Sequence, residues 1–123
     1  MIDPAKSKLP MDPSIHPSAY PLLTAGMEPL LRSYLAVIGR YVQQHSIPIG
    51  RVEISGFEDP EEGDQQVVVA LWIGLPATEA MGQWHEVGRA IEDWVNGLSD
   101  LEADAIAEGI AMEVYSDVDD AAA

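Results

Sequence analysis

The sequence contains no cysteine, and no lysine follows Lys8. Without cysteine the chain can form no disulfide, no thiolate nucleophile and no cysteine-based zinc or iron–sulfur site. Its central apolar run, Val67–Leu75, is far shorter than the roughly 20 residues that a membrane-spanning helix needs. Residues 1–8 lack the apolar core of a secretory signal. These absences predict a cytoplasmic protein that is soluble, has no membrane contact and carries no cofactor.

Motifs that would name a reaction are also missing. The sequence has no glycine-rich dinucleotide loop, no P-loop and no G-x-S-x-G nucleophile turn. His85-Glu86 would begin a zinc-protease helix, but Arg89 stands where the second histidine belongs. Glu79, His85 and Glu92 share part of one helix surface, an arrangement that is common on solvated helix faces. We therefore predict a protein that is not an enzyme, with no catalytic residue and no metal ligand.

Basic residues are scarce: 21 acids against six bases give a formal net charge of −15. Residues 1–26 hold two acids and two lysines, so the whole acid excess belongs to residues 27–123. A field of this sign repels phosphate backbones and anionic membranes and attracts cationic surfaces. The charge predicts a basic protein partner and no direct nucleic-acid binding. Adaptation to concentrated salt is a second interpretation of the same acid excess.

Residues 1–26 contain five prolines and no sustained apolar periodicity. Prolines at such intervals oppose both helix and sheet formation, so we expect a proline-rich, largely disordered arm. The alternative is a docking arm, in which Ile15, Tyr20, Leu22 and Leu23 cover an apolar patch of the same or a second subunit.

Residues 27–116 read as a single α+β domain, followed by a frayed acidic and alanine-rich tail at 117–123. Apolar periodicity and capping signals predict six elements. These are a helix from Glu28 to His45, a strand from Arg51 to Phe57, a strand from Gln65 to Leu75, a helix from its N-cap Thr78 to Asn96, a short helix from its capping box at Ser99 to Glu108, and a strand from Ile110 to Ser116. The order α-β-β-α-α-β predicts a small, mainly antiparallel sheet of three strands, made of a β-hairpin and the C-terminal strand, with two long helices and one short helix.

The predicted central strand is apolar on both faces. Val67, Val69, Leu71 and Ile73 point to one face, and Val68, Ala70 and Trp72 point to the other. Because two helices cover only one face of a small sheet, the arm or a second copy of the chain must cover the other. We therefore predict a homodimer. The candidate dimer or pocket residues are Val67, Val69, Leu71, Trp72, Ile73, Tyr34 and Trp84.

The predicted hairpin loop, 58–64, has carboxylates at five of its seven positions. Their order does not match a calcium-binding loop, so we expect a solvated turn. The predicted function is to bind, and in doing so inhibit or neutralise, a basic protein through this acidic surface. The contact residues would be Glu58, Asp59, Glu61, Glu62, Asp64, Glu86, Glu92 and Asp93. The alternative is a salt-adapted domain that binds or transforms a small ligand in an apolar pocket between the first helix and the sheet.

Overall fold

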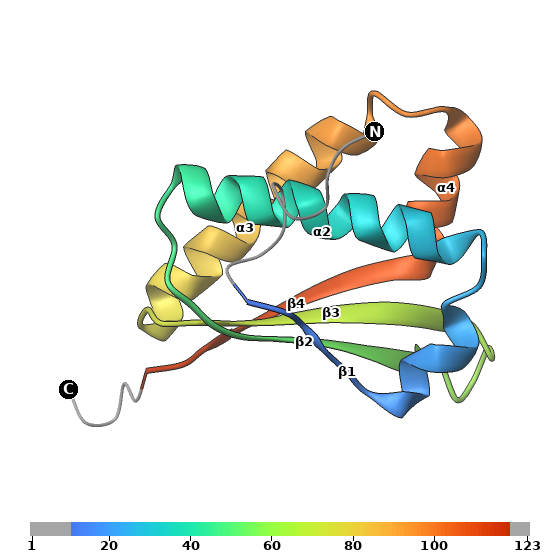
Figure 1. The fold of residues 1–123 in the computed structure, drawn as a ribbon, viewed down its shortest axis with the longest axis horizontal. Helices are drawn as coiled ribbons and strands as arrows, with labels where there is room; N and C mark the ends of the chain where they lie inside the picture. Colours follow the sequence, from blue (N-terminus) through green and yellow to red (C-terminus); the bar gives the residue numbers. More distant parts are fainter. Residues whose placement is uncertain (1–10, 119–123) are drawn as a thin grey trace.

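The structure is a computed structural model and describes residues 11–118 (Figure 1). In chain order the elements are β1 (Ser14–Ile15), the 3-10 helix η1 (Pro17–Leu22), α2 (Met27–Gln44), β2 (Ile49–Glu58), β3 (Gln65–Ile73), α3 (Ala77–Val95), α4 (Asp100–Gly109) and β4 (Ile110–Ser116). Both α2 and α3 lie on one face of the sheet, and α4 lies at the same end of it as the β2–β3 hairpin (Figure 1). The predicted α+β class is confirmed.

The sheet has four strands in the order β1-β2-β3-β4. The predicted hairpin is present, because β2 and β3 are antiparallel, but β4 runs parallel to β3 and β1 runs parallel to β2. The prediction of a mainly antiparallel sheet of three strands was therefore wrong in strand number and in direction. Between β3 and β4, α3 and α4 carry the chain back to the end where β3 began, and such a helical crossover gives parallel pairing.

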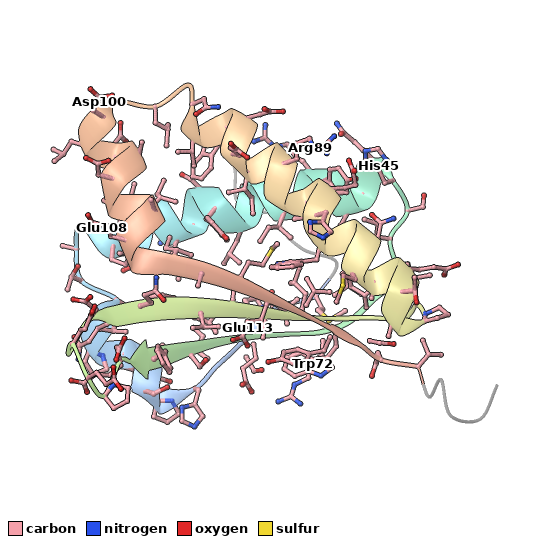
Figure 2. The ribbon with its side chains drawn as sticks, turned by 180° about the vertical axis from the view of Figure 1, so that it is seen from behind. His45, Trp72, Arg89, Asp100, Glu108 and Glu113 are labelled. Carbon is pink, nitrogen blue, oxygen red and sulfur yellow. The ribbon has the colours of Figure 1, made fainter. Side chains whose placement is uncertain are left out.

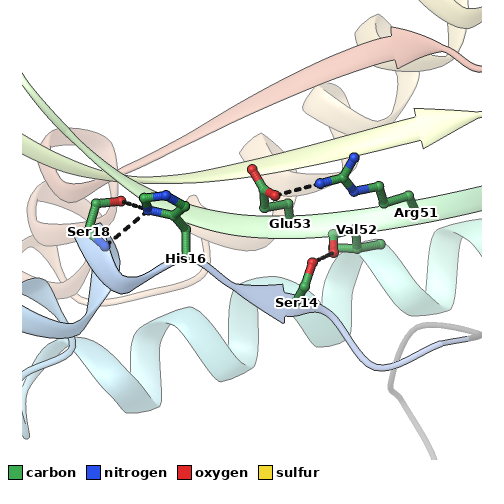
Figure 3. A network of polar contacts seen from close by, with 6 residues as sticks. All are labelled: Ser14, His16, Ser18, Arg51, Val52 and Glu53. Carbon is green, nitrogen blue, oxygen red and sulfur yellow. Dashed lines mark hydrogen bonds and ion pairs between the residues drawn. The ribbon is translucent and has the colours of Figure 1, made fainter.

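Residues 14–22 lie within the segment expected to be a disordered arm, and they form β1 and η1 along the edge of β2. The backbone N–H of His16 donates to the Ile54 carbonyl at 2.8 Å. The Ser14 hydroxyl donates to the Val52 carbonyl at 3.3 Å (Figure 3). These bonds occupy the outer edge of β2, so the described part of the arm belongs to the sheet.

Polar side chains fix η1 although it is rich in proline. The ring of His16 accepts from the backbone N–H of Ser18 at 3.1 Å, and the Ser18 hydroxyl accepts from the backbone N–H of Gly56 at 2.9 Å (Figure 3 draws the His16–Ser18 pair). Ala19 is completely buried beneath them. Since a side-chain acceptor at a helix start replaces missing backbone partners, η1 is stable without a regular helical sequence.

The core lies between the sheet and the helices α2 and α3. Four of the seven candidate dimer or pocket residues, Val67, Val69, Leu71 and Ile73, are at most 1 % exposed and pack inside the chain. They therefore belong to the monomer core and leave nothing for a second copy to contact. Residues 1–10 and 119–123, which include the start of the predicted arm and most of the predicted tail, lie outside the described residues.

On the other face of β3, Val68 and Ala70 are buried within the single chain. Glu53 on β2 and Glu113 on β4 are the register partners of Ala70. Ala70 is 5 % exposed and Val68 is 9 % exposed. Long polar side chains can shelter small apolar neighbours with their stems. For Val68 and Ala70, therefore, neither the arm nor a second chain is needed as a cover.

Two of the three α-helix starts differ from their predictions, and α2 begins at Met27, one residue before Glu28. The Ser99 hydroxyl accepts from the backbone N–H of Glu102 at 3.3 Å and donates to the Glu102 carboxylate at 2.9 Å, which confirms Ser99 as the cap of α4. By contrast, α3 begins at Ala77 after Pro76, without a side-chain cap, so Thr78 is not its N-cap. The extended backbone of Pro76 starts the helix without help from a side chain.

Candidate functional site

The β2–β3 hairpin is held in shape by the first acid of its loop. A carboxylate oxygen of Asp59 accepts from the backbone N–H of Glu61 at 2.8 Å and of Glu62 at 3.3 Å. The Asp59 carbonyl accepts from the N–H of Gly63, whose φ of 76° lies in the left-handed region that favours glycine. Asp59 therefore organises the turn, and Glu61 and Glu62 project into solvent.

A groove of about 770 Å³ lies between this hairpin and the last turn of α4. We call it the acidic groove. Its lining residues include the acidic Asp59, Asp64 and Glu108 and the apolar Met27, Phe57 and Ala105. Phe57 is 53 % exposed, which is unusual for a large aromatic side chain. The groove therefore brings acidic and apolar residues together.

No cationic side chain of the described residues lines the acidic groove. Within residues 11–118 the ion pairs are Arg32–Glu28 at 2.6 Å, Arg51–Glu53 at 2.7 Å and Arg89–Glu86 at 4.0 Å. All three use carboxylates outside the groove. Its negative charge is therefore available to a partner.

The predicted acidic contact residues fall into two separate groups. Glu58, Asp59, Glu61, Glu62 and Asp64 lie at the hairpin end, whereas Glu86, Glu92 and Asp93 lie on α3. Figure 2 shows Glu108 at the end of α4 and Arg89 on α3, in different parts of the molecule. Only Asp59 and Asp64 line the acidic groove, together with Glu108, which the sequence did not identify.

A second groove, of about 510 Å³, lies between α3 and β4. We call it the edge groove. Its walls are Trp84, Gly88 and Ile91 of α3 and Met112 of β4, with Tyr34 of α2 reaching it from below; His85, Arg89 and Glu92 complete the lining. Two candidate pocket residues, Tyr34 and Trp84, thus meet in one place. Trp72 does not line it, and the groove opens beside β4, whereas the predicted pocket lay between the first helix and the sheet.

Tyr34 is the buried polar residue of the edge groove. It is 4 % exposed, and its ring meets Trp94 edge-on at 6.4 Å between centroids. Burial raises the pKa of its hydroxyl from 10.0 to about 12, because ionisation inside the protein lacks the solvation that water provides. No hydrogen bond joins this hydroxyl to any residue from 11 to 118, and its oxygen is not among the orphaned buried atoms of these residues, so it reaches the space of the groove.

The sheet face turned away from the helices carries a row of stacked side chains. The Arg51 guanidinium lies 4.6 Å from the centroid of the Trp72 ring, and Trp72 stacks on Tyr115 at 5.0 Å. Figure 2 shows Trp72 and Glu113 projecting from this face. The Tyr115 hydroxyl donates to the Glu113 carboxylate at 2.6 Å, and this bond raises the pKa of Tyr115. Trp72 is therefore packed against side chains of the two neighbouring strands, Arg51 of β2 and Tyr115 of β4.

The histidines serve local structure. His16 caps η1, His45 stacks on Tyr41 with 4.2 Å between ring centroids, and His85 contacts Trp84 at 5.2 Å. Among residues 11–118, no three histidine or carboxylate side chains are grouped so that they could hold a metal ion. The described helices include none with an apolar stretch of membrane-spanning length.

Comparison of the chain with protein-family models, with curated proteins and with solved structures gave no match. The fold defines an α+β domain with a mixed sheet of four strands among the described residues. The acidic groove and the edge groove are its candidate binding sites.

Proposed function

We propose that this chain is a non-enzymatic interaction protein that binds a basic protein segment in the acidic groove, and so inhibits or neutralises its partner. One observation carries the proposal. Three acidic and three apolar residues line the same groove, and no cationic side chain of the described residues lines it to neutralise the acids.

The groove matches the two parts of a lysine or arginine side chain. Such side chains have an apolar stem and a charged head, so the stem can lie on Met27 and Phe57 while the head reaches Asp59, Asp64 or Glu108. An arginine can also stack on the exposed Phe57 ring. The side chain of Gln66 donates to the Glu108 carbonyl at 3.3 Å and so ties the end of α4 to the hairpin strands. The groove is therefore largely formed before a partner binds.

The net charge of −15 adds a long-range contribution. Charge of one sign over a small domain accelerates the encounter with a cationic partner and makes the rate fall with added salt. Selectivity must come from the groove itself, because every acidic side chain of the chain contributes to this general attraction.

We expect the triple variant Asp59→Asn, Asp64→Asn, Glu108→Gln to bind an oligo-arginine peptide roughly tenfold more weakly than the wild type, since three partly screened charge pairs are lost. Asparagine at 59 keeps the side-chain oxygen that organises the turn. Fluorescence anisotropy of a labelled peptide at physiological salt measures the affinity.

The matched control is Asp12→Asn, Glu79→Gln, Asp93→Asn, which removes the same charge from three exposed residues outside the groove. We expect it to weaken binding about threefold or less, through the general field alone. Equal losses of affinity for both triple variants would mean that peptide binding depends only on the net charge. The acidic groove would then not be the binding site.

The salt-adaptation interpretation predicts a different behaviour. If the acid excess is a device for concentrated salt, the fold will need salt to screen its own repulsion. Our proposal expects the same circular dichroism spectrum in dilute buffer and in concentrated potassium chloride. Unfolding in dilute buffer would contradict it.

Light scattering on the same samples tests the predicted homodimer.

A further inference from the structure

The outer edge of β4 has no strand partner among the described residues. The backbone N–H of Asp117 donates to the Ile73 carbonyl of β3 at 2.7 Å. In a parallel pair, alternate residues direct both backbone groups to the same neighbour. Residues 113 and 115 therefore face β3 together with Asp117, and Met112, Val114 and Ser116 turn their N–H and C=O groups outward. An edge of this kind is a template for another strand.

The edge groove runs beside this free edge, because Met112 of β4 forms one of its walls. The facing wall comes from α3, where Trp84 is 40 % exposed. Gly88 leaves room between them: a Cβ atom built there meets no atom within 4 Å. A chain paired with β4 would place every second side chain in this groove, against Trp84, Ile91 and Met112.

The Tyr34 hydroxyl supplies a polar group inside the groove. No hydrogen bond joins this hydroxyl to residues 11–118, and Tyr34 lines the groove although the residue as a whole is only 4 % exposed. Among the described residues Gln83 Oε1 is the orphaned buried side-chain atom and the Tyr34 oxygen is not one, so this oxygen reaches the space of the groove. A backbone carbonyl or side-chain acceptor of a bound segment can accept a hydrogen bond from it.

The opposite side of the β4 edge is acidic. Glu113 and Asp117 are exposed there, and neither takes part in an ion pair within the described part of the chain. The exposed Tyr115 ring lies between them in sequence. Side chains of a bound strand that point to this face would meet carboxylates and an aromatic ring, both of which favour arginine or lysine.

We propose that the free edge of β4 and the edge groove form a strand-addition site for an extended peptide in which apolar and basic residues alternate. The backbone of the peptide pairs with Met112, Val114 and Ser116. Because side chains alternate along a strand, apolar ones enter the groove towards Tyr34 and Trp84, and basic ones lie over Glu113.

Two other occupants fit less well. A second copy of the chain would bring two charges of −15 together and place another β4, with its own Glu113, against the acidic side. A small molecule in the groove would leave the outward backbone groups of β4 unpaired. The proposal concerns a site separate from the acidic groove and does not depend on the function proposed for it.

The test uses a short labelled peptide of alternating valine and arginine. Two derivatives are N-methylated, one at all valine amides and the other at all arginine amides. In an added strand only one of these sets faces β4. We expect one derivative to bind roughly tenfold more weakly and the other to bind like the parent, since backbone hydrogen bonds are lost in one case only.

Variants of residues that line the edge groove show whether the peptide binds there. Gly88→Leu fills the edge groove and should weaken binding at least roughly tenfold through exclusion of a buried side chain. The matched control is Gly82→Leu on the same helix. A Cβ atom there also meets no atom within 4 Å, and Gly82 does not line the groove, so this variant should leave the affinity unchanged. Tyr34→Phe should weaken binding by roughly threefold, the loss of one hydrogen bond.

Three results would overturn the proposal. The first is equal binding of both methylated peptides. The second is unchanged binding to a folded Gly88→Leu protein. The third is a stable dimer, seen by light scattering, that Gly88→Leu dissociates, which would assign the edge to a second copy. The triple variant of the acidic groove separates the two proposals, because it should keep the difference between the methylated peptides even if its overall affinity falls.

Discussion

Replacing Gly56 by alanine is expected to destabilise the protein by about 3 kcal/mol, a loss typical of overpacking at a buried backbone contact. A Cβ atom at Gly56 would meet the Ser18 carbonyl oxygen, lie 2.8 Å from the Ser18 carbonyl carbon and lie 3.1 Å from a methyl group of Leu22. Two of these atoms are backbone and cannot rotate aside. We therefore expect η1 to move away from β2 and expose the buried Ala19.

Gly50→Ala in the same strand is the control. A Cβ atom there meets the carboxylate of Asp117, the flexible tip of an exposed side chain, which can turn away. We expect a change of less than about 1 kcal/mol. Urea unfolding measures both variants, and limited proteolysis reports whether residues 11–26 are released. Similar stabilities for the two variants would mean that η1 does not pack against β2 as closely as the structure shows.

The elements between residues 27 and 116 could be predicted because their signals are local. The Ser99-x-x-Glu102 box marks the start of α4, and the uncharged run beginning at Val67 marks the central strand. Such patterns depend on residues a few positions apart, which is the range over which capping and periodicity act. They fixed the type of each element in this part of the chain.

Strand direction and the fourth strand could not be predicted from such patterns. The direction of β4 depends on how α3 and α4 return the chain, and β1 has only two residues, far too few for a periodic signal. The bonds that hold the arm join Ser14 to Val52 and Ser18 to Gly56, 38 residues apart. Proline content alone predicts disorder. It does not show that the side chains of Ser14 and Ser18 form hydrogen bonds with β2 that hold this segment in place.

The candidate sites, like the fold, were predictable where the sequence signal is local and not where it depends on contacts between distant elements. The acidic loop was evident from sequence, but Glu108 lies 44 residues beyond Asp64 and joins the groove only through the placement of α4. Likewise Tyr34 and Trp84 were candidate dimer or pocket residues, and they share a groove only because α2 and α3 pack beside each other. Contacts between distant elements determine which of many plausible residues meet.

Raising the pH from 10 to 12 should lower the free energy of unfolding of the wild type by about 2 kcal/mol through Tyr34 alone. Burial raises the pKa of this hydroxyl from 10.0 to about 12. Below pH 10 both states keep the proton, so the full contribution is present. Between the two pKa values the unfolded chain loses its proton while the folded chain keeps it, so stability falls. Urea unfolding at several pH values measures the slope.

Tyr34→Phe isolates this effect from the repulsion that every acidic protein suffers at high pH. At neutral pH the variant should differ from the wild type by less than about 1 kcal/mol, because the hydroxyl has no hydrogen-bond partner among the described residues. Above pH 10 it should lose stability less steeply. Tyr20→Phe is the control, since Tyr20 is 60 % exposed and its hydroxyl is in water before and after unfolding. Parallel slopes for the wild type and Tyr34→Phe would place the Tyr34 hydroxyl in water, and the edge groove would then lack the buried polar group that its proposed ligand needs.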